Sequence, residues 1–198
     1  MLTPSENALR WLKKNRWGVG SAIMLTILAG MCIANDSRPA PRSVAVVPAP
    51  SKFDAFMVQT GNIKVTFVDG HAEMWTENGN AILPKISYRG HIGWVELDKS
   101  QIDIATKNRA GQDKLVIRLN DGARREFVMT RDTPFIANWS FADDDTAVSV
   151  LVSGHHGPRS YVEYDLRSGR VKGEIAGYAS YETLPTWAKQ VSDDRSNQ

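Results

Sequence analysis

An uncharged stretch of eighteen residues near the N-terminus, residues 17–34, is the feature that most constrains this chain. At ~1.5 Å per residue, a helix of this length measures about 27 Å, close to the ~30 Å hydrocarbon core of a bilayer. Four basic residues precede the stretch, and only two, Arg38 and Arg42, follow it within residues 35–50. The positive-inside rule then directs residues 1–16 to the cytoplasm. We expect a transmembrane helix (a signal anchor) over 17–34 in the inner membrane, with the chain after Asn35 in the periplasm.

A cleaved signal peptide would give the same topology, and it is the alternative interpretation of this segment. Cys32-Ile33-Ala34 provides a passable small-residue cleavage site. The apolar run is nevertheless longer than the core of about 7–15 residues that is usual in signal peptides, and the basic region before it is also long. These two features favour the uncleaved anchor. Cleavage would instead release a secreted β-rich effector.

A proline-rich segment, residues 35–52, follows the predicted anchor. Pro39, Pro41, Pro48 and Pro50 are spaced along it. Proline lacks an amide N–H, so we expect neither a helix nor a central strand there. The segment is predicted to be an extended, semi-rigid tether at ~3.1 Å per residue where it is polyproline-like.

The segment from 53 to 191 has the signals of strands and turns, and residues 192–198 are expected to be a disordered tail. Ile63, Val65 and Phe67 alternate with polar residues, and Asp69-Gly70 is a two-residue hairpin signal. Further strand candidates are 71–75, 93–97, 101–106, 114–119, 124–129, 147–152, 161–166 and 170–175. Only 184–190 suggests a short helix. We predict an all-β, antiparallel meander, either sandwich-like or propeller-blade-like, behind the transmembrane helix.

The charge and cysteine content of the chain argue against several classes of function. Residues 51–198 hold eighteen basic and twenty acidic side chains, so this part has no basic excess with which to neutralise phosphates. We therefore predict no nucleic-acid partner. The single cysteine, Cys32, lies in the apolar segment, so neither a disulfide nor a catalytic thiol is expected in the β domain.

Two stretches of the β domain are similar to each other. Trp94 and Trp139 are 45 residues apart, and the turn glycines Gly122 and Gly169 are 47 apart. Each tryptophan is followed by two strand candidates and then by a glycine turn. A period of this length is typical of propeller blades, so we consider an internal repeat.

The second of these stretches, residues 137–176, resembles blades of the TolB-type β-propellers. The resemblance rests on Trp139-Ser140, on the acidic turn 143–145, and on the run from Tyr161 to Gly169. Asp144-Asp145 stands where that family usually has a turn glycine. The resemblance implies four-stranded meanders. Three blades' worth of chain is too little to close a propeller, which needs about four to eight blades, unless subunits combine. A sandwich or open barrel of about ten strands is the alternative.

Histidines and aspartates offer the strongest hint of chemistry. His155-His156 lies between two strand candidates, and Asp143 and Asp145 lie in the preceding turn. Together they could serve a metal-dependent hydrolase, which is our alternative function. Zinc sites require three or four convergent ligands, and the HExxH and paired-cysteine spacings are absent from the sequence. The plainer interpretation is two exposed loop histidines and a solvated turn, with no metal, cofactor or catalytic residue.

Aromatic side chains suggest recognition instead. We expect Trp94 and Trp139 to fill the core. Tyr178 and Tyr181, together with His155 and His156, are the candidate binding residues, because rigid amphipathic rings provide contact area at low entropic cost. The predicted function is a non-catalytic, membrane-anchored binding or assembly protein of the bacterial envelope. Its expected partner is another envelope protein or a polymer.

Overall fold

A computed structural model describes most of the chain beyond the predicted anchor. The described residues are 39–51, 58–100, 102–103, 108–109 and 111–193. The predicted transmembrane helix and its flanks, residues 1–38, lie outside them. Residues 39–198 form one compact unit, and the architecture below is that of this unit alone. Among the residues described, no helix combines the length and the apolar character that crossing a membrane requires.

Strands dominate the described residues, which confirms the all-β prediction. In chain order they are β1 (Pro41–Pro48), β2 (Gly61–Phe67), β3 (Ala72–Met74), β4 (Ala81–Ile86), β5 (Ile92–Glu96), β6 (Ile102–Asp103), β7 (Asn108–Arg109), β8 (Lys114–Arg118), β9 (Arg124–Val128), β10 (Phe135–Ala142), β11 (Ala147–Ser153), β12 (Arg159–Asp165) and β13 (Val171–Ile175). A 3₁₀ turn, η2 (Tyr181–Thr183), and one α-helix, α3 (Thr186–Asp193), follow β13.

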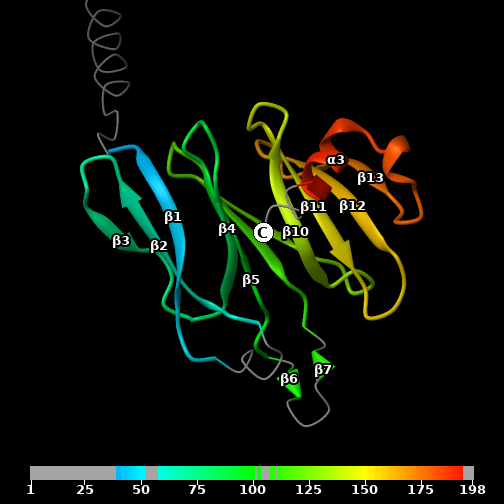
Figure 1. The fold of residues 1–198 in the computed structure, drawn as a ribbon, viewed down its shortest axis with the longest axis horizontal. Helices are drawn as coiled ribbons and strands as arrows, with labels where there is room; N and C mark the ends of the chain where they lie inside the picture. The colour runs from blue at the N-terminus through cyan, green and yellow to red at the C-terminus, as the bar shows by residue number, and fades with distance from the viewer. Residues whose placement is uncertain (1–38, 52–57, 101, 104–107, 110, 194–198) are drawn as a thin grey trace, which may run out of the picture. The chain divides into compact units, whose positions relative to one another are not determined.

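The strands form two main sheets, in which every pairing is antiparallel. The first has the order β1-β2-β4-β5-β8-β9, with β3 also paired to β2, and the second has the order β10-β11-β12-β13. The pair β6 and β7 forms a separate small hairpin. Figure 1 shows the strands β1 to β3 on one side, β4 and β5 in the middle, and the second sheet with α3 on the other side.

The strands β5 and β8 are buried on both faces because elements pack on each side of them. Trp94 and Val116 face a cluster with residues of β1 and β2, whereas Val95, Leu115 and Ile117 face the second sheet. Side chains alternate across a strand, so a strand covered on both faces needs a continuous apolar run. That requirement explains the near-continuous burial of both strands.

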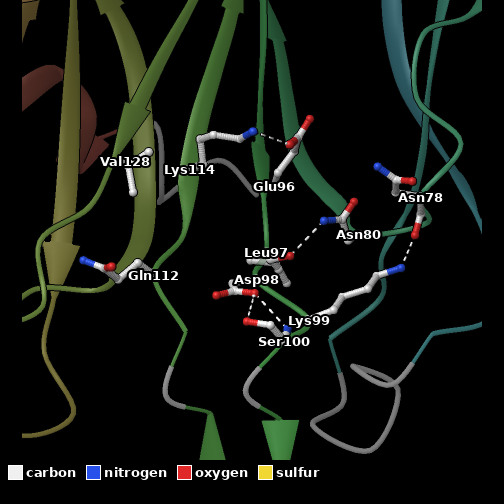
Figure 2. Close-up of a pocket in the computed structure, with 10 residues that line it drawn as sticks. All are labelled: Asn78, Asn80, Glu96, Leu97, Asp98, Lys99, Ser100, Gln112, Lys114 and Val128. Atoms are coloured by element: carbon white, nitrogen blue, oxygen red, sulfur yellow. Dashed lines mark hydrogen bonds and ion pairs between the residues drawn. The ribbon is translucent and has the colours of Figure 1, made fainter.

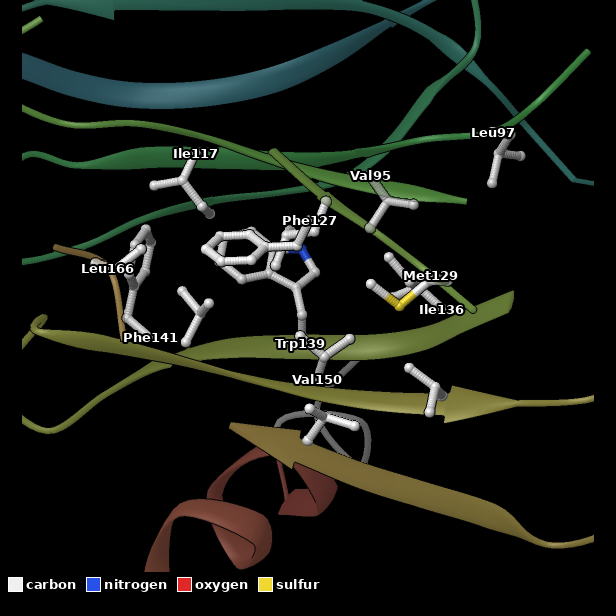
Figure 3. Close-up of a cluster of buried hydrophobic side chains, with 14 residues drawn as sticks. Val95, Leu97, Ile117, Phe127, Met129, Ile136, Trp139, Phe141, Val150 and Leu166 are labelled. Carbon is white, nitrogen blue, oxygen red and sulfur yellow. The ribbon is translucent and has the colours of Figure 1, made fainter. Parts of the chain in front are cut away.

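The larger cluster joins the first sheet to the second (Figure 3). Its centre is Trp139 of β10, which is fully buried, as is Trp94. The predicted core positions of these two tryptophans are therefore confirmed. The other members come from β5, β8, β9, β10, β11, β12 and the residues that follow them, and they include Leu97, Phe127, Met129, Val150 and Leu166.

The two ends of the strands differ in their connections. At one end, which we call the turn end, the connections are 68–71, 87–91, 119–123, 143–146 and 166–170. Four of these short turns contain a glycine with positive φ: Gly70, Gly90, Gly122 and Gly169. At the opposite end, which we call the loop end, lie the connections 75–80, 97–113, 129–134 and 154–158 and the segment 176–180. Pro41, where β1 begins, is at the turn end, because its ring lies 3.5 Å from the Cβ position of Gly90.

Eight of the eighteen residues of the predicted tether form an edge strand of the β unit rather than a free spacer. Residues 41–48 form β1, which pairs with β2 from Pro41↔Phe67 to Pro48↔Gly61. Val44, Val46 and their neighbours supply β-branched side chains, and the two prolines lie at the ends of the strand, where a missing donor is tolerated. The compact unit therefore begins by Pro39 rather than at residue 53.

Strand β4 is not among the strands predicted from the sequence, because Pro84 interrupts it. The strand accommodates the proline with a register shift between Ile82 and Lys85 and with a left-handed Leu83, whose φ is 49°. A bulge frees the proline from the ladder, since its ring nitrogen cannot donate a hydrogen bond. Sequence alternation alone gave no sign of this irregular strand.

The C-terminal helix is longer than predicted. It spans Thr186–Asp193 rather than 184–190, so residues 192 and 193, which we expected in a disordered tail, are helical. Residues 194–198 lie outside the described residues. Ala188 and Val191 are the buried residues of this helix, which packs on β10, β11 and β12.

The two similar stretches of sequence correspond in the structure at their glycine turns but not at their tryptophans. Gly122 lies in the turn between β8 and β9, and Gly169 in the turn between β12 and β13, so both belong to the last hairpin of a sheet. Trp94, however, lies on β5, whereas Trp139 lies on β10, the first strand of the second sheet. The two tryptophans also belong to different clusters, so they are not equivalent positions of a repeat.

Candidate functional site

A cleft of about 650 Å³ opens at the loop end of the first sheet (Figure 2). We call it the polar cleft. One wall is the connection between β3 and β4, and the others are the end of β5, the start of β8 and the end of β9. Its lining residues are Asn78, Asn80, Glu96, Leu97, Asp98, Lys99, Ser100, Gln112, Lys114 and Val128.

A ladder of ion pairs crosses the sheet beside this cleft. Register places Glu96 opposite Lys114, and the ammonium of Lys114 lies 3.0 Å from the carboxylate of Glu96 and 3.2 Å from that of Glu126. The guanidinium of Arg124 lies 2.7 Å from the other oxygen of Glu126. The indole N–H of Trp94 donates to Glu96 at 3.1 Å, which fixes that carboxylate above the buried core.

These contacts shift the pKa values of Lys114 and Glu126. Burial lowers the pKa of Lys114, but the hydrogen bond and charge of Glu96, followed by those of Glu126, outweigh it and raise the pKa overall. Burial raises the pKa of Glu126, but hydrogen bonds from Arg124 and Lys114 outweigh it, and the pKa is lowered. Both groups are therefore held in their charged forms, which suits a structural ion pair rather than proton transfer.

Two carboxamides in the cleft are oriented by the main chain. The amide nitrogen of Asn80 donates to the carbonyl of Leu97 at 2.8 Å, and that of Gln112 donates to the carbonyl of Met129 at 2.6 Å. Each carboxamide has one N–H engaged in this way, and its oxygen is an additional acceptor. The cleft thus contains two acceptors whose directions are fixed before any ligand arrives.

The floor of the cleft is formed by three consecutive polar residues after β5. The hydroxyl of Ser100 donates to Asp98 at 2.7 Å, and the main-chain N–H of Ser100 donates to the same oxygen at 2.8 Å. The ammonium of Lys99 donates to the carbonyl of Asn78 on the opposite wall, as Figure 2 shows. Gly111 permits this arrangement, because a Cβ there would lie 2.6 Å from the Asp98 carboxylate.

A second cleft, of about 470 Å³, lies at the turn end. Tyr88, the acidic turn 143–145 and Trp187 of α3 are among its lining residues. All three aspartates have left-handed φ angles, between 48° and 63°. Asp143 pairs with Lys172, and the Asp145 carboxylate accepts the main-chain N–H of Arg89 at 3.0 Å. The acidic turn therefore joins two connections of the fold.

The structure does not bring the predicted metal ligands together. Asp143 and Asp145 precede β11, and His155 and His156 follow it. The seven residues of β11 separate the two pairs by about 20 Å at ~3.3 Å per residue. Within the described residues, no three histidine, cysteine or acidic side chains are placed to hold one metal ion. The site that the hydrolase alternative requires is therefore not assembled from these four residues.

The predicted recognition residues are partly brought together. His155 and His156 are exposed at the loop end, where the His155 ring lies edge-on to Phe135 at 4.8 Å. Tyr178, which is 85% exposed, is at the same end, because the neighbouring Gly177 packs directly on the main chain of Arg159. Tyr181 lies apart from this group, in η2, and its hydroxyl donates to Asp193 of α3 at 2.7 Å.

Sequence reasoning missed the polar cleft entirely. Its charged residues lie in separate strands, and strand pairing alone makes Glu96, Lys114 and Glu126 neighbours. Comparison of the chain with protein-family models, with curated proteins and with solved structures found no match.

Proposed function

We propose that this chain is a non-catalytic binding protein of the bacterial envelope, anchored in the inner membrane by residues 17–34 and presenting the loop end of its β unit to an envelope protein or polymer. The observation that carries this proposal is the asymmetry between the two ends. The turn end has short turns and the smaller of the two clefts described above, whereas the loop end has the longer connections, the polar cleft and the exposed Tyr178, His155 and His156. Binding residues are concentrated in loops held by a rigid scaffold.

The direction in which β1 runs supports the same proposal. Strand β1 begins at the turn end, seven residues after Ala34. At ~3.6 Å per residue, these seven steps span about 25 Å at most. An anchor ending at Ala34 would therefore keep the start of β1 within about 25 Å of the end of the anchor.

We further propose that the sheets are blade-like units, as the resemblance to TolB-type propellers implies. Equivalent connections of neighbouring units touch: the hydroxyl of Tyr88, between β4 and β5, donates to the carbonyl of Asp144, between β10 and β11, at 3.4 Å. Arg125 of β9 donates to the carbonyls of Leu166 and Arg167, in the turn after β12. Contacts between equivalent positions of successive four-stranded meanders are typical of blades packed side by side.

Two exposed tyrosines provide a matched test of the binding end. Tyr178 lies at the loop end and is 85% exposed, and Tyr88 lies at the turn end and is 74% exposed. The photo-crosslinking residue p-benzoyl-phenylalanine would replace each in turn in the full chain, expressed in cells. We expect a specific adduct from position 178 and none from position 88, with the chain retained in the membrane pellet after an alkaline wash.

The outcomes separate the parts of the proposal. A soluble chain shortened to about residue 35 would contradict the anchor and support the secreted effector. Adducts from position 88 alone, or from neither position, would contradict recognition at the loop end.

A further inference from the structure

The polar cleft has the chemistry of a site for one class of ligand. Four charged side chains line it, Glu96 and Asp98 with Lys99 and Lys114, so their formal charges cancel. Lys114 is also neutralised from both sides by Glu96 and Glu126. A strongly charged ligand would gain no net attraction here and would lose its hydration. The charge balance therefore favours an uncharged ligand.

The hydrogen-bonding groups of the cleft match hydroxyls in particular. Asn80 and Gln112 offer carboxamide oxygens as acceptors, and each has one N–H engaged with a main-chain carbonyl, which orients the group. Lys99 has three N–H donors, of which the structure assigns one to the carbonyl of Asn78. Fixed donors and acceptors thus lie within one cleft. A hydroxyl group both donates and accepts, so a ligand with several neighbouring hydroxyls satisfies both kinds of group.

The size of the cleft and its open side suit a chain of sugar residues better than a single sugar. A volume of about 650 Å³ is within the usual range for small-molecule sites, which is about 300–1,000 Å³. Val128, at the end of the edge strand β9, is 59% exposed and gives an apolar spot against which C–H groups can pack. Among the residues that the structure describes, β9 is the last strand of its sheet, so the sheet does not continue past that side of the cleft.

We propose that the polar cleft binds an uncharged sugar chain, with the Asn80 and Gln112 carboxamides and the Lys99 ammonium holding its hydroxyls. This inference rests on the proposed function and deepens it, because it makes the partner at the loop end a neutral polysaccharide. The ion-pair ladder of Glu96, Lys114 and Glu126 keeps the wall of the cleft rigid and electrically neutral.

Titration calorimetry of the full chain tests this directly. The protein would be purified in a detergent without a sugar headgroup, and titrated with maltohexaose, cellohexaose and chitohexaose. We expect saturable binding of at least one of these neutral hexasaccharides. Hexagalacturonate, which has a carboxylate on each ring, is the charged comparison and should bind more weakly or not at all.

Variants locate the binding. Lys99→Ala and Gln112→Ala should each weaken it by about tenfold or more, because each removes a hydrogen bond to the ligand. Val128→Trp should block the cleft from an exposed position without disturbing the core. Lys64→Ala, at an exposed lysine of β2 outside the cleft, is the control and should bind like the unmodified chain. Circular dichroism would confirm that each variant is folded.

Three results would overturn the inference: no binding of any neutral hexasaccharide, equal binding by the cleft variants and the control, or tighter binding of hexagalacturonate. The cross-linking experiment and the sugar titration test different parts of the proposal. An adduct at position 178 with no hexasaccharide binding would leave the binding function intact and reject only the sugar ligand. Sugar binding without membrane retention would reject the anchor and keep the ligand.

Discussion

The indole N–H of Trp139 donates a 2.8 Å hydrogen bond to the main-chain carbonyl of Leu83, which ties the second sheet to β4. Leu83 is the left-handed residue of the β4 bulge, with a φ of 49°. The irregularity that accommodates Pro84 thus lies at the residue whose carbonyl accepts this bond. Trp139 is fully buried and Leu83 is partly buried, so the bond is largely shielded from solvent.

Trp139→Phe should destabilise the fold strongly. Phenylalanine leaves a cavity and deprives the Leu83 carbonyl of its donor, for a combined loss of about 2–4 kcal/mol in the free energy of unfolding. Denaturant titration of the full chain would measure it. Trp75→Phe is the control, because Trp75 is partly exposed and should cost about 1 kcal/mol or less. Equal losses in the two variants would contradict the special position of Trp139.

Asp144→Gly should stabilise the protein. Asp144 is exposed and has a φ of 52°, where glycine is free of the Cβ strain that other residues experience. Its interaction with Tyr88 uses the main-chain carbonyl, which the substitution keeps. We expect a gain of about 0.5–1 kcal/mol in the free energy of unfolding. Asp144→Ala retains the Cβ, so a gain of the same size from alanine would show that backbone strain is not the cause.

Stability should fall as the pH drops below about 6.5, the ordinary pKa of histidine, because of His91. Burial lowers the pKa of His91, and its Nδ1 accepts the main-chain N–H of Asn120 at 3.0 Å. The unfolded chain therefore takes up this proton at a higher pH than the folded protein, which costs stability as the pH falls. Unfolding measured between pH 7.5 and 5.5 should show the decline, and His91→Gln should remove it.

His71 is the control for that titration, with the opposite sign. The hydrogen bond that the His71 ring donates to the Asp69 carboxylate raises the pKa of His71, so its contribution is present below the ordinary pKa and is lost as the pH rises through the raised value. His71 is an exposed residue of the β2–β3 hairpin. His71→Gln should therefore leave the decline below pH 6.5 in place. If it abolished the decline, the assignment to His91 would be wrong.

Lys114→Met should destabilise the protein through the charges that it leaves behind. Glu96, whose side chain is only 16% exposed, would lose its closest cation. Solvent still reaches the pair, so we expect a loss of about 1–2 kcal/mol in the free energy of unfolding. Adding Glu96→Gln should recover part of it. A double variant no more stable than the single one would indicate that Lys114 acts by packing alone.

The sequence determined the local structure wherever the signal was itself local. Alternation at Ile63, Val65 and Phe67 gave β2, and Asp69-Gly70 gave its hairpin, because side-chain period and turn conformation depend on adjacent residues. Burial of Trp94 and Trp139 followed from their size and apolar character. The all-β class followed from the sum of such signals.

Tertiary structure decided which residues became neighbours, because strand pairing brings together positions that are distant in sequence. It recruited residues 41–48 into β1, gave Leu83 and Pro84 a place in an irregular strand, and assembled the polar cleft from four separate segments. It also sent Asp143 and His155, which the sequence puts twelve residues apart, to opposite ends of β11. An extended strand keeps residues near in sequence far apart in space, whereas cross-strand pairing unites Glu96 with Lys114.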